Sequence, residues 1–386
     1  MNGVKQALKL LDMWIERNGW EGYDPYDIKG TKLFLFFQKN KYTNFASNLL
    51  LNRFPMFFRK VFRVRREINA KAMALFARGY LNLYKKSGDE AYLKKGLFCL
   101  NWLMKNPSKG YSGFCWGYPF DWQSRVFIPK NTPSGVVTSI AAHAFIDAYE
   151  ILGDRKYLEI AKSCCEFILN DLNIDQVSKD KICFSYTPID NFHVHNANLF
   201  SASTLLRIYT YIKNEKYKEK GIMAINFTVS YQNHDGSWYY WAPPDKLLYN
   251  IDNYHTGFVL ECLNICRRVL KDEFEYEEEL RKGLKFYKNH LFLDDGTPKM
   301  TPNSVYPIDI HSCAQAIITF CELADFEPNY LSMAEKVAKW TIENMQDKEG
   351  YFYYRIYKTY VNKIPYIRWG QAWMLRALSY LAGDRR

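Results

Sequence analysis

Three segments in the second half of the chain place histidine and carboxylate side chains next to one another. They read HVHNAN, IDNYHTG and YPIDIHS, and they supply the candidate catalytic residues His195, Asp252, Tyr254, His255, Asp309 and His311. An imidazole titrates near neutral pH, so it can remove or deliver a proton, and a neighbouring carboxylate can orient it. Helix capping explains one Asp or Asn in each segment but does not explain the accompanying histidine. The pattern therefore predicts proton-transfer chemistry.

An aromatic segment nearer the N-terminus, GFCWGYPFDWQSRVF, has the residue types that bind a hydroxylated ring. Aromatic faces stack on such rings, and a guanidinium pairs with a carboxylate through two parallel hydrogen bonds. The segment contributes the candidate binding residues Trp116, Tyr118, Asp121, Trp122 and Arg125. The alternative is a packed loop closed by an Asp121–Arg125 pair. Other links between expected helices add the candidate binding residues Tyr186, Asn196, Asn198, Asn253, Arg368, Trp369 and Gln371.

The same histidines could bind a metal ion together with Asp252 and Asp309. However, the sequence has no His-x-x-x-His pair and no Cys-x-x-Cys pair. It also lacks a serine nucleophile elbow, a phosphate-binding P-loop and the Rossmann glycine fingerprint. We therefore expect side-chain acid–base chemistry with no metal and no organic cofactor.

A repeated helical unit must position these residues. An aromatic residue on a helical stretch is followed by a polar break and a turn, and the copies begin at Trp14, Trp102, Phe167, Phe227, Phe286 and Trp340. Successive copies are roughly sixty residues apart, except for a longer first gap, and such a period marks stacked supersecondary units. Six helical hairpins favour a closed ring, an all-α (α/α)6 toroid that forms one domain over residues 1–386. Its mouth can hold a substrate.

Each hairpin is expected to consist of an outer and an inner helix. Outer helices, amphipathic and rich in Lys and Glu, are predicted over residues 4–18, 90–106, 155–171, 216–231, 274–291 and 330–345. Inner helices, richer in small residues, are predicted over 68–87, 133–152, 195–213, 253–270, 309–324 and 367–382. Links from inner to outer helices are short. The links from outer to inner helices are long, carry the candidate residues, and include expected β-hairpins at 237–243 and 351–366.

Residues 33–66 depart from the repeat and fill its long first gap. This segment is apolar and basic at the same time. One interpretation is a membrane-surface or partner-docking element. The alternative is an extra helical pair that packs on the ring or covers its mouth.

Composition limits the partners and the compartment. The net charge of +11 could favour an anionic substrate, or it could reflect lysines spread over solvated helix faces. No basic stripe with interleaved aromatics appears, so no nucleic-acid partner is expected. The 9 cysteines lack paired spacings and indicate buried free thiols in a reducing compartment. With no signal-type apolar core at the N-terminus, we expect a cytoplasmic protein that is membrane-peripheral at most.

Two stretches resemble the C-terminal domain of glucuronyl C5-epimerases. NTPSGVVTSIAAHAFIDAYEIL (131–152) resembles its Thr-Pro-Ser…Asp-x-Tyr stretch, and YNIDNYHTGFVLECL (249–263) is similar to its Asp-Tyr-His-Thr segment, with Asn253 inserted. Those enzymes invert C5 of uronic acids in a polymer, on an (α/α) toroid. The match covers a small part of the chain, the family's upstream β-rich domain is missing, and its catalytic tyrosines do not transfer.

Two broader resemblances concern the whole architecture. GFCWGYPFDWQSR, YPIDIHSCAQAI and NKIPYIRWGQAW resemble a group of (α/α)-toroid proteins associated with polysaccharide biosynthesis, which implies a fold and a pathway but no reaction. QNHDGSW (232–238) and, more weakly, QDKEGYF (346–352) resemble the Gln…Gly-x-Trp repeat of squalene cyclases and protein prenyltransferases. In those families the repeat ties helices together.

The resemblances and the residues together imply an enzyme acting on an oligo- or polysaccharide that carries uronic acid or is otherwise polar. C5 epimerisation or a related proton abstraction is the favoured chemistry, with a histidine as base. A glycoside hydrolase or polysaccharide lyase, a non-catalytic glycan-binding or assembly protein, and a prenyltransferase-like or cyclase-like toroid remain as alternatives.

Overall fold

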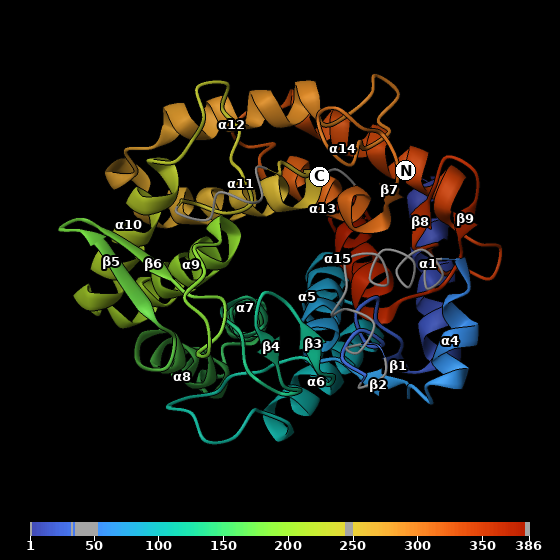
Figure 1. Ribbon diagram of the computed structural model, residues 1–386, viewed down its shortest axis with the longest axis horizontal. Coiled ribbons are helices and arrows are strands. Elements are labelled where there is room, and N and C mark those ends of the chain that lie inside the picture. Colours follow the sequence, from blue (N-terminus) through green and yellow to red (C-terminus); the bar gives the residue numbers. More distant parts are fainter. Residues whose placement is uncertain (1, 32–33, 35–52, 244–249, 383–386) are drawn as a thin grey trace.

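Six helices form the inner wall of a closed ring in the computed structural model, which describes residues 2–31, 34, 53–243 and 250–382. They are α5 (Ala70–Ser87), α7 (Gly135–Leu152), α9 (His195–Ile212), α11 (Asn253–Leu270), α13 (Ile310–Glu322) and α15 (Ala372–Leu381). Each packs against the next, and α15 packs against α5 (Figure 1). The ring therefore closes, as the repeat predicted.

Six outer helices surround this wall. They are α1 (Asn2–Asn18), α6 (Glu90–Lys105), α8 (Arg155–Asn170), α10 (Glu215–Val229), α12 (Glu277–His290) and α14 (Asn329–Met345). Their apolar stripes face inward: α8, for example, buries Leu158, Ala161, Cys165 and Ile168 at helical spacing. The inner helices are buried on nearly all sides. Among the described residues, α7 has the length and hydropathy of a membrane span, and 72% of it lies inside the ring.

Glycine–aspartate pairs explain why two of the inner helices, α5 and α7, end where the next outer helix begins. Gly88 adopts φ 71° and donates its N–H to Tyr84 O, which closes α5 in the left-handed conformation that glycine tolerates best. Asp89 then accepts from Ala91 N and caps α6. Gly153 and Asp154 repeat this arrangement between α7 and α8. The predicted short links are confirmed.

Buried charges fill the axis of the ring below its mouth. Glu261 on α11 pairs with Arg376 on α15 and approaches Arg78 on the opposite helix α5, at 3.9 Å. Arg78 also pairs with Asp147 on α7, which in turn holds Arg207 on α9. One chain of ion pairs thus links five inner helices. It separates the two ends of the ring.

Small sheets and turns make up the long links. The described strands are β1 (Glu21–Gly22), β2 (Glu67–Ile68), β3 (Trp122–Gln123), β4 (Phe127–Ile128), β5 (Ile174–Ser178), β6 (Lys181–Phe184), β7 (Ile308–Asp309), β8 (Arg355–Ile356) and β9 (Val361–Asn362). The hairpin expected at 351–366 is present as β8–β9. Residues 237–243 form no hairpin, because Trp241 instead makes a single bridge to Val194. The β5–β6 hairpin was not foreseen.

The two Gln–Gly turns act as ties between hairpins, as their resemblance implied. Gln232 donates to Gly236 O within its own turn and to Glu279 O on α12. Gln346 donates likewise to Gly350 O and to Ala7 O on α1, which joins the last hairpin to the first. These side-chain bonds close each turn and fix neighbouring units together.

Only part of segment 33–66 is described. Residues 55–61 form a short helix, α4 (Pro55–Val61), at the outer edge of the ring (Figure 1). Residues 35–52 lie outside the described part of the chain. A short 3-10 turn, η1 (Lys271–Glu273), follows α11, and a π-helical turn, η2 (Ile367–Gln371), leads into α15. All 9 cysteines are free thiols, and all but Cys321 are buried.

Candidate active site at the mouth of the helical ring

A cavity of about 310 Å³ lies where the N-terminal ends of the inner helices converge. This volume is at the lower end of the range for pockets that bind small ligands. Its walls include ten of the residues expected from the sequence: Tyr118, Trp122, Tyr186, Asn196, Asp252, Tyr254, His255, His311, Arg368 and Trp369. Long links and inner-helix starts supply them all. The structure therefore brings together residues that are up to about 250 positions apart.

Asp252 and His255 form a carboxylate–imidazole pair at the start of α11. Asp252 Oδ1 accepts the backbone N–H of His255 and caps the helix, while Oδ2 lies 2.6 Å from His255 Nδ1. Because the carboxylate can only accept, Nδ1 carries the proton and Nε2 keeps its lone pair. The carboxylate is buried, the imidazole is 22% exposed, and both residues line the cavity. This arrangement suits a general base.

His311 is a second imidazole on the same cavity, and it is almost fully buried. Neither ring nitrogen has a hydrogen-bond partner among the described residues. Burial lowers the pKa of His311 well below its usual value, and the nearby Lys71 and Arg368 lower it further. The ring packs against Tyr254 and Trp369, with centroids 4.9 and 4.6 Å away. A neutral imidazole with both nitrogens unsatisfied is a group that a polar ligand would satisfy.

Lys71 brings a buried amine to the floor of the cavity. It lies in the first turn of α5, is 4% exposed, and has its Nζ over the rings of Trp373 and Phe258 at 5.4 and 5.6 Å. Among the described residues, no carboxylate forms an ion pair with it. Burial lowers the pKa of Lys71 well below its usual value, and the neighbouring Arg368 adds to this effect. Burial therefore disfavours the charged form of the amine, although its two ring contacts favour that form.

Arg368 closes the wall beside Lys71, but its charge is already balanced. Its Nε and one terminal nitrogen bind both oxygens of the buried Asp24. The guanidinium also lies over the ring of Tyr118, 4.7 Å from its centroid. Arg368 is thus a rigid wall of fixed orientation, with only its remaining nitrogen outside the ion pair.

Tyrosine hydroxyls supply the remaining polar groups of the wall. Burial raises the pKa of Tyr26 to about 12, although Arg355 and Arg368 oppose it. Burial likewise raises the pKa values of Tyr118 and Tyr186, and it raises that of Tyr254 well above its usual value. These phenols stay protonated at neutral pH. They can donate hydrogen bonds or protons but cannot act as bases.

Several expected site residues have structural roles away from the cavity. Asp309 is buried and accepts hydrogen bonds from Arg355 Nε, Trp369 Nε1 and the backbone N–H of His311. Hydrogen bonds to the backbone hold Trp116, Asp121, Asn198, Asn253 and Gln371. His195 packs on Phe227 and Tyr231 beside a smaller pocket, and burial lowers its pKa to about 3. Arg125 lies over the ring of Trp241, 4.4 Å from its centroid.

Six aromatic or basic residues of the wall were missed. These are Tyr26, Lys71, Phe192, Tyr240, Trp241 and Phe258. Lys71 follows the same rule as the histidines, since it begins an inner helix after a long link, and that position could have identified it. Phe258 was indistinguishable from a core residue, because only the three-dimensional packing shows which face of α11 meets the cavity.

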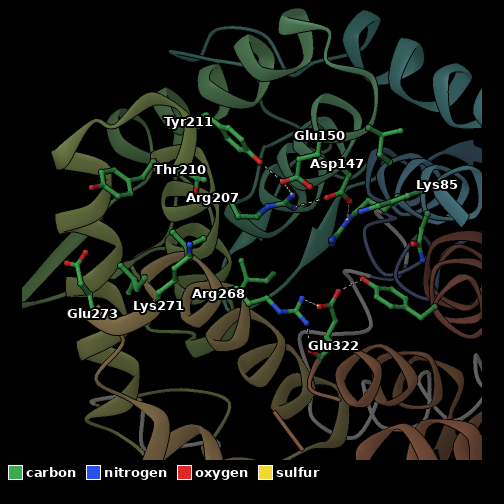
Figure 2. A pocket seen from close by; sticks show the side chains of 18 of the residues that line it. Lys85, Asp147, Glu150, Arg207, Thr210, Tyr211, Arg268, Lys271, Glu273 and Glu322 are labelled. Atoms are coloured by element: carbon green, nitrogen blue, oxygen red, sulfur yellow. Dashed lines mark hydrogen bonds and ion pairs between the residues drawn. The ribbon is translucent and has the colours of Figure 1, made fainter. Parts of the chain in front are cut away.

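A larger cavity, of about 760 Å³, opens at the opposite end of the ring. Several of its charged side chains pair with one another: Figure 2 shows Arg207 between Asp147 and Glu150, and Arg268 against Glu322. Tyr211 donates to Glu150 and Tyr380 to Glu322. Paired charges of this kind hold the ends of the inner helices together. The mouth with the unpartnered imidazole is therefore the better candidate site.

No family model matches the sequence, and no curated protein matches it either. Solved structures of other proteins, however, match the fold of this chain. A sugar epimerase from a ruminal bacterium is 16% identical, with a TM-score of 0.63 over 83% of this chain and 91% of that one. A cellobiose 2-epimerase from Bacillus thermoamylovorans is 13% identical, with a TM-score of 0.62 over 82% and 90%. An unsaturated glucuronyl hydrolase specific for heparin is 12% identical, with a TM-score of 0.64 over 99% and 97%.

These structures share the fold. Their low identity supports the (α/α)6 toroid and does not carry a reaction over to this chain. The similarity to glucuronyl C5-epimerases expected from two short stretches does not appear among these three structures. The chemistry must be argued from the site.

Proposed function

We propose that the protein is a sugar epimerase that removes and returns a proton on the carbon next to a carbonyl group. The observation that carries the proposal is the pair of imidazoles on one cavity. His255 lines the cavity and is held by Asp252 through its Nδ1, and His311 is buried and neutral. Epimerisation needs a base on one face of the carbon and an acid on the other. The ring of Tyr254 contacts both imidazoles, with its centroid 4.3 Å from that of His255 and 4.9 Å from that of His311.

The roles follow from the surroundings of each group. His255 takes the proton, because Asp252 stabilises the imidazolium that forms. His311 returns a proton to the other face once it has gained one from solvent or substrate. The developing enolate oxygen needs donors fixed in place, and Lys71 Nζ, Tyr26 and Arg368 are the groups that line that part of the wall. Trp122, Tyr186 and Trp369 offer ring faces for the sugar.

The charges of the cavity favour a neutral saccharide over a uronate. A carboxylate substrate needs a free cation, but Asp24 already neutralises Arg368, and Asp309 neutralises Arg355. Burial lowers the pKa of Lys71 well below its usual value and so disfavours the charged amine that a carboxylate would need. A reducing sugar in its open form carries a carbonyl without a charge and fits these constraints. C5 epimerisation of a uronate is the second candidate within the same chemistry.

Hydrolysis has less support from the site. It needs two carboxyl groups that face the glycosidic bond. The described carboxylates of the cavity are Asp190 and Asp252. Asp190 accepts hydrogen bonds from Thr187 and from the backbone of Tyr186 and Phe192, and Asp252 is bound to His255. Neither is free to act as a glycosidase acid.

The test is incubation of the purified protein in heavy water with two substrate panels. One holds neutral reducing mono- and disaccharides, the other uronic-acid oligosaccharides. Deuterium at the carbon next to the carbonyl, with appearance of the epimer by NMR, supports the proposal, and the responding panel identifies the substrate class. Hydrolysis products, an unsaturated product, or binding of sugars without exchange would each overturn it in favour of a hydrolase, a lyase or a binding protein.

A further inference from the structure

Helix α4 and its two end residues present apolar side chains on two adjacent faces. Phe58 and Phe62 face inward and pack with the buried Ile28 and Phe34. Phe54, Phe57 and Val61 face outward and are 54%, 62% and 55% exposed. A surface helix of a water-soluble protein normally has one apolar face and one polar face. The outward face of α4 therefore lacks a partner in the described structure.

The chain's net charge is concentrated in the same region. Between Asp27 and Glu67 the sequence has no Asp or Glu, whereas the basic residues there are Lys29, Lys32, Lys39, Lys41, Arg53, Arg59, Lys60, Arg63, Arg65 and Arg66. The rest of the chain holds 42 Lys and Arg against 41 Asp and Glu, so it is nearly neutral. The +11 of the protein is thus a local property of this segment. The excess positive charge is therefore not spread over the solvated helix faces, as one interpretation of the sequence proposed.

The basic side chains around α4 are available to a partner. Arg53, Lys60, Arg63 and Arg65 are exposed, and none of them forms an ion pair among the described residues. Arg53 does lie over the ring of Tyr360, 5.0 Å from its centroid. Positive charge beside exposed aromatic rings is the combination that binds the interface of an anionic bilayer.

A buried arginine fixes α4 to the mouth of the ring. Arg59 is 2% exposed, pairs with Asp27 at 2.7 Å and donates to Asp24 O. Asp24 in turn binds Arg368 in the cavity wall. The outward face of α4 consequently has a fixed orientation relative to the cavity. A surface that docked there would hold the mouth at a constant position.

We propose that α4 and its flanking basic residues (Arg53, Phe54, Phe57, Lys60, Val61 and Arg63) dock on a membrane that contains anionic phospholipid. The exposed rings enter the region between headgroups and acyl chains, and the basic side chains bind the lipid phosphates. A second copy of this chain is a weaker fit. A stable protein interface takes roughly 20–30 residues a side, and the copy would bring the same positive charge.

The experiment is sedimentation of the full-length protein with vesicles. Neutral phosphatidylcholine vesicles are compared with vesicles that also hold phosphatidylglycerol, at low and at high salt. We expect binding to the anionic vesicles only, and weaker binding at high salt because salt screens the attraction. Replacement of Lys60→Glu with Arg63→Glu should lower partitioning by at least about fivefold per residue.

A triple variant tests the apolar contribution: Phe54→Ser, Phe57→Ser and Val61→Ser should also lose vesicle binding. The matched control removes exposed apolar groups elsewhere, with Val177→Ser, Ile189→Ser and Leu293→Ser, and should bind as the parent does. Circular dichroism and urea unfolding in solution, without vesicles, confirm that each variant is folded.

Three results would overturn the proposal. The first is equal binding to neutral vesicles, and the second is unchanged vesicle binding by the α4 variants. The third is a parent protein that runs as a dimer in gel filtration while the triple variant runs as a monomer. The last outcome would identify the face as a contact between copies of the chain. The proposal does not depend on the proposed catalytic activity, so either can fail alone.

Discussion

Asp252 has two tasks that a single substitution can separate. One oxygen caps α11 and the other holds His255 Nδ1. Asp252→Asn keeps the capping oxygen, since Asn caps as well as Asp does, but removes the acceptor that fixes the imidazole. We expect turnover to fall by about 10²–10⁴-fold with the free energy of unfolding changed by less than about 0.5 kcal/mol. Asp252→Ala should in addition lose about 1 kcal/mol from the cap. Urea unfolding and turnover assays measure both.

The buried Lys71 should make the free energy of unfolding depend on pH. Its pKa in the folded protein is lowered by burial, whereas the unfolded chain has an ordinary value of about 10.4. Between these two values the unfolded state binds the extra proton, so the free energy of unfolding rises with pH, by up to about 1.4 kcal/mol per unit. Lys71→Met removes this slope and the amine. The prediction fails if parent and variant gain equally in stability between pH 7 and 10, or if the variant keeps full activity.

Residue types at helix starts predicted part of the site and could not predict the rest. His255, His311 and Arg368 were found because polar residues with no local capping role stood at the end of a long link. Asp309 and Asn253 stood at equivalent positions but turned inward, toward Arg355 and Leu291 O. The sequence pattern fixes the position of a side chain along the chain. Whether that side chain meets a cavity or a neighbouring helix depends on the crossing of elements that the pattern does not contain.

At the level of elements, the last hairpin approaches the first so closely that a glycine between them should not tolerate a larger residue. A Cβ on Gly350 would lie 2.2 Å from Leu10 O, and its φ is +104°. A Cβ on Gly88 would meet nothing within 4 Å, at φ +71°. Gly88→Ala should cost about 1 kcal/mol from backbone strain alone. Gly350→Ala should cost about 2 kcal/mol or more, because α1 must also move. Equal losses in urea unfolding would show that this approach does not matter.

Helix boundaries could be predicted closely because each has a local cause. The Gly–Asp pairs at 88–89 and 153–154 and the 3.6-residue apolar period identified the hairpins to within a few residues. The π-turn at 367–371 was taken for the start of α15, since its composition is that of the helix that follows. The strand content of 237–243 was overestimated for a related reason. Alternating aromatics also suit a loop packed between helices.

At the scale of the whole molecule, the ion cluster on the axis predicts a large cost for losing one carboxylate. Burial alone would raise the pKa of Glu261, but Arg376 and Arg78 lower it below its usual value. Glu261→Gln removes the negative charge beside the buried guanidinium groups of Arg376 and Arg78. The free energy of unfolding should fall by about 3–5 kcal/mol. The matched control, Glu278→Gln in the exposed Glu278–Lys282 pair, should change stability by less than about 0.5 kcal/mol. Urea unfolding of both variants measures the difference, and similar losses would contradict the role given to the cluster.

Closure of the ring gives this chain two ends with different chemistry. The end reached by the short links holds several ion pairs, and the end reached by the long links holds the two imidazoles and the buried amine. The repeat in the sequence predicted the closed ring. It could not predict the chain of ion pairs across the axis, because Glu261 and Arg376 lie on helices that are far apart along the chain.

The account rests on proton transfer by His255 at the mouth of the ring. The most direct measurement is the rate of deuterium uptake from heavy water into a reducing disaccharide, for the parent, for His255→Asn and for the exposed control His234→Asn. We predict uptake at the carbon next to the carbonyl with the parent and the control, and a fall of about 10²–10⁴-fold with His255→Asn. No uptake by the parent, or equal uptake by all three proteins, would contradict the account.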